Sequence, residues 1–521
     1  MSDNRNDTLS RRDLLVSGAA MTAGGLALSS LGSKQARAEA PQKGGTLRLG
    51  MAGGATTDSL DPATLTSHMP TNITWQLRNN LVEISPNGEA IPELAESWDA
   101  KAGARTWVFN LRKGVEFHNG KSLVAEDVVY SLNYHRGENS SSGAKGLVTS
   151  IVNIKADGPH QIVIELESGN ADLPSLLSDY HLQIVPAGTT DFSDGQGTGG
   201  YQLQSFEPGV RGLTTRNPNY WKEGRAHVDA IETLGIADVA ARTSALQTGQ
   251  VDLINKVDPK TLGLLKRAKG VRILAAKGGR HLPFLMRTDT APYTNNDLRL
   301  ALKYAINREQ MLQTILRGYG QIGNDHPIPI TDPFHASNLS QRSYDPDKAA
   351  YHFKKAGMEG QEITIHTSDA AFEGAIDSAV LFKESASKAG ISVNVQREPA
   401  DGYWSSVWMQ KPFCTSYWSG RPTADSMLSV AYKSDAAWND SFWKRADFDQ
   451  LLIDARAELD SQRRREMYHD LQKMIQEDGG AIIPVFADFL DAGRDHVKGY
   501  AGSPDGHLSG DRAGERVWLD S

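Results

Sequence analysis

The sequence predicts an α/β protein made of several folding units, and three observations lead to this class. The chain has 521 residues, enough for about three to four domains at roughly 150 residues each. Strand-like alternation and helix-like periodicity both occur along its length. Two short strands at 362–366 and 391–395 are separated by a helix-length stretch, which predicts a βαβ unit with parallel pairing. Because no repeat or low-complexity linker separates these patterns, we expect lobes that the chain visits more than once.

The first half of the chain is expected to contribute strands. Residues 46–49 form a short strand that leads into a polar loop rich in glycine, and such loops often contact ligands. At 106–112 and 161–167 apolar and polar residues alternate, which predicts two half-buried strands of an antiparallel sheet.

The second half is expected to contribute helices. Apolar residues at three- and four-residue steps predict one helix over 297–317, capped by Asn296 and ended by Gly318. Pro346 and Gly357 mark the start and the end of the next helix. Further helices are expected at 372–388, 447–459 and 461–477, the last one capped by Asp460 and carrying Met467 and Met474 in the core.

Composition and charge exclude several classes of protein. Hydrophobic residues make up 39% and charged residues 23% of the chain, as in ordinary globular proteins. The net charge of -8 leaves no broad basic surface, so nucleic acid is not an expected partner. Cys414 is the only cysteine, which rules out an internal disulfide and a cysteine cluster for zinc or iron and sulfur. We expect no metal site and no cofactor.

Residues 1–38 have the pattern of an export signal. Arg11 and Arg12 precede a weakly apolar stretch rich in glycine, alanine and serine, and Ala36 and Ala38 mark a cleavage site after Ala38. The paired arginines resemble a twin-arginine signal, which predicts export of the folded protein to the bacterial periplasm. A membrane anchor is the alternative, but the glycines and serines make this stretch too polar for a stable span.

A search for catalytic motifs predicts that the protein is not an enzyme. The sequence contains no HExxH, no GxSxG and no phosphate-binding GxxxxGKS/T pattern. His281, His326 and His335 lack the spacing of four residues that aims two imidazoles at one metal ion. A secreted hydrolase is the alternative from another class, because it would share the export signal and the composition.

The segment 402–443 is the most informative for binding, because it holds five of the ten tryptophans. Flat aromatic side chains bury a large area at low entropic cost, which suits a pocket for organic ligands, and an aromatic core is the alternative. Trp418, Arg421 and Asp425 lie with glycine and proline in one short stretch, which favours a binding loop. Asp425 can attract an ammonium group beside aromatic rings, whereas Arg421 can bind a ligand carboxylate with its planar fork.

A series of motifs occurs in order along nearly the whole chain after the export signal. They lie at 81–83, 91–98, 107–120, 125–128, 197–203, 217–221, 298–308 and 344–346. Together they resemble the extracytoplasmic solute-binding proteins of family 5, which serve ATP-driven importers for peptides, nickel and related solutes. The resemblance implies a two-lobed α/β periplasmic binding protein of type II, with a hinge cleft and an extra subdomain in the first lobe. The implied segments are 39–80, 195–284 and 485–521 for the first lobe, 81–194 for the extra subdomain and 285–484 for the second lobe.

The resemblance also implies a ligand site. Dipeptide-binding relatives hold the peptide amino group with an aspartate after a Trp-x-Gly turn, and Asp425 is the matching position here. The loop 66–69 should line the cleft from the first lobe. The relatives' arginine for the peptide carboxylate has no counterpart at 370–381, and Arg421 is the alternative anion partner. The expected ligand-binding residues are Asp425, Arg421, Trp418, Trp404, Trp408, Ser67 and His68.

We therefore expect a monomeric periplasmic receptor that captures a peptide or a related amine-bearing solute. It would deliver this solute to the permease of an ABC importer in the inner membrane. An opine or an oligosaccharide stacked on tryptophan is the alternative ligand. Nickel ranks last, because the sequence shows no cluster of cysteine or histidine.

Overall fold

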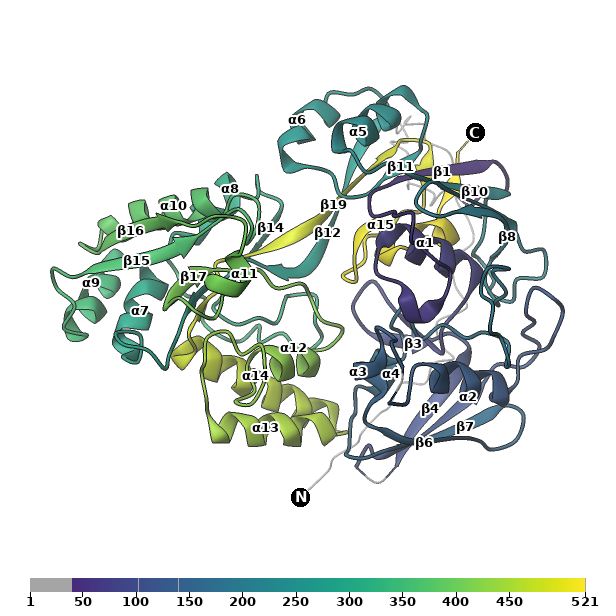
Figure 1. Cartoon of the computed structure of the whole chain (residues 1–521), viewed down its shortest axis with the longest axis horizontal. Helices are drawn as coiled ribbons and strands as arrows, with labels where there is room; N and C mark the ends of the chain where they lie inside the picture. Colours follow the sequence, from purple (N-terminus) through teal and green to yellow (C-terminus); the bar gives the residue numbers. More distant parts are fainter. Residues whose placement is uncertain (1–39, 102, 139, 521) are drawn as a thin grey trace, which may run out of the picture. The chain divides into compact units, whose positions relative to one another are not determined.

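The computed structural model describes residues 40–101, 103–138 and 140–520 (Figure 1). The predicted export signal lies outside these residues. Within them, no helix is both long enough and apolar enough to cross a membrane. Mixed helices and sheets fill the described chain, as the sequence predicts.

One main sheet, here called the β1 sheet, combines segments from distant parts of the sequence. Its order is β12 (Val271–His281), β19 (Val485–Arg494), β11 (Leu253–Ile254), β1 (Thr46–Met51), β10 (Ala230–Gly235), β9 (Arg211–Arg216) and β8 (Tyr201–Glu207), and β14 (Gly320–Ile322) also pairs with β19. β1 is parallel to β10 and β11, and the other pairs are antiparallel. The elements packed with it are α1 (His68–Leu77), α5 (Val239–Thr248), α6 (Leu262–Leu265), α8 (Arg308–Thr314) and α15 (His507–Gly510).

A second sheet, the β15 sheet, contains the predicted βαβ unit. Its order is β16 (Ser392–Arg397), β15 (Glu362–Thr367), β17 (Phe413–Thr415), β13 (Phe284–Met286) and β18 (Ala481–Ile482). β15 and β16 are parallel, and α10 (Ala375–Ser387) connects them. The accompanying helices are α7 (Asn296–Ala305), α9 (Pro346–Lys355), α11 (Tyr403–Ser406), α12 (Ala424–Ala431), α13 (Ala446–Ala457) and α14 (Ser461–Asp478).

A third, antiparallel sheet lies between β1 and β8 in the sequence. Its order is β4 (Ala95–Lys101), β5 (Thr106–Leu111), β7 (Gln161–Leu166) and β6 (Ile151–Ala156), and its helices are α2 (Ala125–Tyr134), α3 (Lys145–Val148) and α4 (Leu173–Leu176). Two further antiparallel pairs are β2 (Val82–Ile84) with β3 (Ala90–Pro92) and β20 (Val497–Lys498) with β21 (Trp518–Leu519), and the short helix α16 (Ala513–Arg516) precedes β21.

Two long strands connect the β1 sheet with the β15 sheet. β12 leads directly into β13, and β18 leads directly into β19. β12 and β19 are hydrogen-bonded to each other in antiparallel register, with a bulge between Ala276 and Arg280 (Figure 1). We call β12 and β19 the crossing strands. Their pairing brings both connections to the same place.

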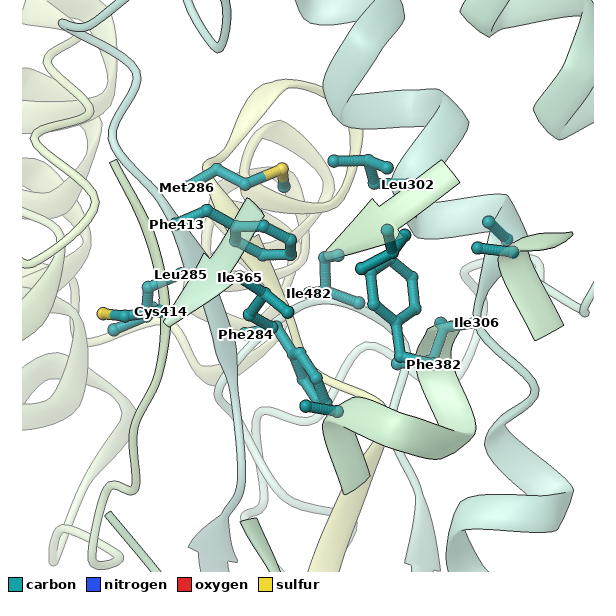
Figure 2. Close-up of a cluster of buried hydrophobic side chains, with 14 of the residues drawn as sticks. Phe284, Leu285, Met286, Leu302, Ile306, Ile365, Phe382, Phe413, Cys414 and Ile482 are labelled. Atoms are coloured by element: carbon teal, nitrogen blue, oxygen red, sulfur yellow. The ribbon is translucent and has the colours of Figure 1, made fainter. Parts of the chain in front are cut away.

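Separate hydrophobic clusters support the sheets. The cluster under the β15 sheet contains Phe284, Leu302, Phe382 and Phe413 as well as Cys414 (Figure 2). Another cluster joins α12, α13 and α14 through residues such as Leu428, Phe448, Tyr468 and Leu471. Burial of large apolar side chains, at roughly 25 cal/mol per Å², is the main stabilisation of each unit.

The predicted strands at 46–49, 106–112 and 161–167 are confirmed. Val108 and Val163 are buried like the apolar residues on either side of them. They are direct partners across the β5–β7 ladder, so each one covers the other.

The predicted single helix over 297–317 is wrong, because the chain forms α7 and α8 instead. Ile306 adopts an extended conformation, and the Asn307 side chain accepts a hydrogen bond from the Gln310 amide to cap α8. Asparagine favours such caps over helix interiors, which ends the first helix at this point. The cap of α7 is Asn295 rather than Asn296. The other helices are confirmed, although α10 begins at Ala375.

A buried ion network fixes the second connection between the sheets. Asp325 is fully buried and accepts hydrogen bonds from Arg308 at 2.7 and 2.8 Å and from Arg342 at 2.8 Å. It also accepts the backbone amide of Ile483, which lies between β18 and β19, at 3.0 Å. The two guanidinium groups hold the pKa of Asp325 below its usual value despite burial, which raises it.

We predict that Asp325→Asn lowers the free energy of unfolding by about 3–5 kcal/mol, because two buried guanidinium groups lose their counter-charge. Urea unfolding at pH 7 measures this loss. Asp435→Asn is the matched control, since Asp435 is exposed beside Lys433 and its removal should change little. A loss of under about 1 kcal/mol for Asp325→Asn would contradict the role of Asp325 as the counter-charge of the two buried arginines.

Candidate ligand-binding site

The segment after β17 docks onto the end of β12. Trp418 and His281 exchange two backbone hydrogen bonds of 3.0 Å each, as an isolated antiparallel bridge. Gly279 and Gly420 touch next to this bridge: a Cβ on Gly279 would lie 3.0 Å from the Cα of Gly420. Glycine at both positions therefore permits the close approach. This docking places the predicted binding loop against a crossing strand.

Three aromatic side chains next to this bridge remain exposed. Trp404, Tyr417 and Trp438 are 41%, 40% and 49% exposed. Trp404 makes edge-to-face contacts with Trp408 and Tyr417, with ring centroids 5.8 and 5.6 Å apart, and Trp438 lies 6.1 Å from Trp418. We call these five rings the aromatic surface. Exposed rings in contact with one another are typical of surfaces that bind organic ligands.

The fifth tryptophan of the predicted segment has a different role. Trp443 is buried in the cluster of α12, α13 and α14, and its ring lies 5.0 Å from that of Phe448. The aromatic segment thus contains both of the alternatives that its composition leaves open: Trp443 is core, whereas Trp404 and Trp438 are at the surface.

Asp440 holds the aromatic surface from beneath. One of its carboxylate oxygens accepts hydrogen bonds from the indole nitrogens of Trp408, at 3.1 Å, and Trp418, at 2.9 Å. Burial raises the pKa of Asp440 to about 7, and the two indole donors oppose this rise. No sequence pattern pointed to this role, because the contacts join Asp440 to tryptophans in two other segments.

Two arginines border the aromatic surface. The Arg280 guanidinium lies 5.4 Å from the centroid of the Tyr417 ring, and the Arg421 guanidinium lies 5.6 Å from that of Trp418. The surrounding protein lowers the pKa of both arginines, although solvent reaches them. Among the described residues, neither one has a carboxylate partner or a side-chain hydrogen bond. Arg421 was predicted for the site, whereas Arg280 was not.

Asp425 is committed to a different contact. Both of its carboxylate oxygens lie 3.0 Å from Nε of Arg456, and only 7% of the residue is exposed. Burial raises the pKa of Asp425 to about 6, while Arg456 opposes the rise. Its other charged neighbours are Asp172 and Arg464, which form a buried ion pair of 2.7 Å between α4 and α14. The structure brings Asp425 into this ion network, not into contact with the aromatic surface.

Ser67 and His68 lie at the start of α1, in the β1-sheet part of the chain. Nδ1 of His68 is 2.8 Å from the Asp511 carboxylate, which raises the histidine pKa, and its ring lies 5.6 Å from that of His507. His507 in turn contacts Phe489 on β19, with ring centroids 5.0 Å apart. The Ser67 hydroxyl donates to Asp58 at 3.2 Å. His68 therefore connects to a crossing strand through packed rings.

Two cavities among the described residues lie elsewhere. One cavity of about 670 Å³ is lined by 58–61, 190–194, 203–206 and 208, and another of about 390 Å³ is lined by 338–340 and the end of α14. Neither includes a predicted site residue. No group of histidine, cysteine and carboxylate side chains within the described ranges is placed to hold a metal ion.

We predict that Asp440 makes stability depend on pH in the acid range. Its folded pKa of about 7 lies above the ordinary value of 3.8, so its contribution is full below about pH 4, declines as the pH rises to about 7 and is constant above. Asp440→Asn should remove this decline. Between pH 5 and 6, the free energy of unfolding of the variant should therefore rise by about 1.4 kcal/mol relative to that of the wild type. Urea unfolding at pH 5, 6 and 8 tests this, and parallel profiles would refute it.

Comparison with known proteins identifies the family. Residues 89–440 match the family described as bacterial extracellular solute-binding proteins, family 5. The dipeptide-binding protein of Escherichia coli strain K12 is 25% identical over 473 residues, which cover 82% of this chain and 87% of that protein. The heme-binding protein A of Haemophilus influenzae is 26% identical over 469 residues, covering 83% and 85%.

A solved structure agrees with the fold. That of HbpA2 from Haemophilus parasuis superimposes with a TM-score of 0.82 at 20% sequence identity and covers 92% of this chain and all of its own. The family match spans well over half of the sequence, and the fold includes the two sheets joined by crossing strands. The chain therefore belongs to the bacterial extracellular solute-binding proteins of family 5.

Proposed function

We propose that the protein is the substrate-binding component of an ABC importer, and that it captures a peptide or a related amine-bearing solute for the permease. Family membership and the dipeptide-binding relative support this proposal. The observation that carries it is the exposed aromatic surface, which lies beside unpaired arginines on a loop docked to a crossing strand. The protein acts as a monomer in the periplasm, after export by the twin-arginine route, and catalyses no reaction.

The crossing strands are the hinge of this proposal. Segments 39–80, 195–284 and 485–521 form the first lobe, 81–194 its extra subdomain and 285–484 the second lobe. The sheet memberships support this division, because β12 and β19 continue into strands of the other sheet. A ligand that contacts both lobes stabilises the closed form by its additional contacts there, so affinity and closure depend on the same free energy.

We predict that a free-acid di- or tripeptide raises the melting midpoint of the purified protein, because a ligand that binds the native state stabilises it. A thermal-shift screen should include peptides, an opine, oligosaccharides and nickel. Mass spectrometry of the bound peptide should recover it intact. If only the opine or the sugar raises the melting midpoint, that compound and not a peptide is the ligand. If the peptide is recovered in cleaved form, the protein is a hydrolase instead of a receptor.

Within this proposal, Asp425 holds the ligand amine, which then has to displace Arg456. We predict that Asp425→Asn weakens the binding of a free-amine peptide by about 1–3 kcal/mol, the usual contribution of a hydrogen bond to a charged group. Isothermal calorimetry measures this change. Arg456→Gln is the matched control, because it removes the competing guanidinium and should not weaken the binding of the peptide. Unchanged affinity in Asp425→Asn, together with lower stability, would assign Asp425 to the ion network alone.

A further inference from the structure

We infer that the ligand carries an anionic group, a carboxylate or a group of equivalent geometry, and that Arg280 and Arg421 bind it beside the aromatic surface. This inference rests on the proposed function, since it names the chemistry of the solute that the receptor takes. It adds a residue, Arg280, that neither the sequence motifs nor the resemblance assigns to the site.

Arg280 and Arg421 have neither a carboxylate partner nor a side-chain hydrogen bond within the described ranges. Buried arginines elsewhere in the described chain do have acceptors: Arg308 pairs with Asp325 and Arg464 with Asp172, whereas Arg242 donates to backbone carbonyl groups. A bound anion would supply the missing acceptor for the guanidinium groups of Arg280 and Arg421.

The nearby carboxylates are paired with groups other than Arg280 and Arg421. Glu373, the carboxylate that acts on Arg280 from a distance, is in an ion pair with Lys260. Asp511, which acts on Lys256, is held by His68 at 2.8 Å. Lys256 is itself exposed and close enough to Arg280 to have its pKa lowered by it.

The two guanidinium groups lie near neighbouring rings. Arg280 lies over Tyr417, and Arg421 lies over Trp418, the next residue in the chain. Because no hydrogen bond within the described residues uses either guanidinium, their N–H groups remain available to match both oxygens of a carboxylate.

Arg280 and Arg421 are carried by backbone segments that are docked to each other. Arg280 adjoins His281 on β12, and Arg421 follows Gly420, the residue that touches Gly279. The two arginines thus come from segments that are hydrogen-bonded to each other. This pairing fixes the backbone positions from which their side chains extend before a ligand arrives. A preformed site loses less conformational entropy on binding than one built on mobile loops.

The test compares acids with their amides, so that only the charge changes. The probes are 1-naphthoate against 1-naphthamide, and a random tripeptide library against the same library with amidated carboxyl ends. The variants are Arg280→Gln and Arg421→Gln, with Arg421→Lys to keep the charge without the fork. Arg463→Gln is the matched control, because Arg463 is an exposed arginine on α14 that pairs with Glu458. Melting midpoints without ligand check that every variant folds.

We expect the wild type to bind the acids in preference to the amides. Each Arg→Gln variant should lose about tenfold to a hundredfold in affinity for 1-naphthoate, the range for one charged hydrogen-bonding partner. Arg421→Lys should lose less, and Arg463→Gln should match the wild type. Equal binding of acid and amide, failure of the wild type to bind either acid, or wild-type affinity in both Gln variants would overturn the inference.

The outcomes also separate this inference from the proposed function. If 1-naphthoate binds through the two arginines but no peptide binds in either form, the anion site stands and the peptide is the wrong solute. If peptides bind equally well as acids and as amides, the receptor function stands and the anion site is overturned.

Discussion

The antiparallel pairing of β12 with β19 is the constraint on which the rest of this structure depends. Each strand belongs to the β1 sheet and continues without a long loop into the β15 sheet. Because the two strands are hydrogen-bonded to each other, the chain passes between the sheets at one place. A residue near the end of β12, such as Arg280 or His281, therefore lies where the chain passes from the β1 sheet to the β15 sheet. The buried Asp325 network then holds the second connection through Ile483.

The candidate site is built outward from that strand. The bridge between His281 and Trp418 docks the loop, and the contact of Gly279 with Gly420 allows it to lie flat. Asp440 orients two indole rings from below, which leaves neighbouring rings exposed above. Side-chain carboxylates that are already hydrogen-bonded in this way position a surface for binding without taking part in it.

The distribution of charge partners separates scaffold from site. Arg308, Arg464 and Arg456 each have a carboxylate within about hydrogen-bond distance, and each such pair joins elements that are distant in sequence. Asp425 pairs with Arg456 in the same way, so an amine ligand would have to displace this arginine. The residue types of the loop did not reveal that α13 would supply Arg456. Arg280 and Arg421 stand apart, because the described chain offers them aromatic faces and no anion.

The sequence alone determined the fold class, the βαβ unit, the strand at 106–112, the helix start at Pro346 and the helix cap at Asp460, because these depend on residues a few positions apart. The same local logic failed at 297–317, where helical periodicity continues through Asn307 but the cap that it forms breaks the helix. It also singled out the aromatic segment, in which the structure exposes Trp404, Tyr417 and Trp438. Only the tertiary structure decided the partners of Asp425, the support of two tryptophans by Asp440 and the place of Arg280. Those contacts join residues dozens to hundreds of positions apart, and the free energy that selects them comes from burial and pairing across elements, which no local pattern encodes.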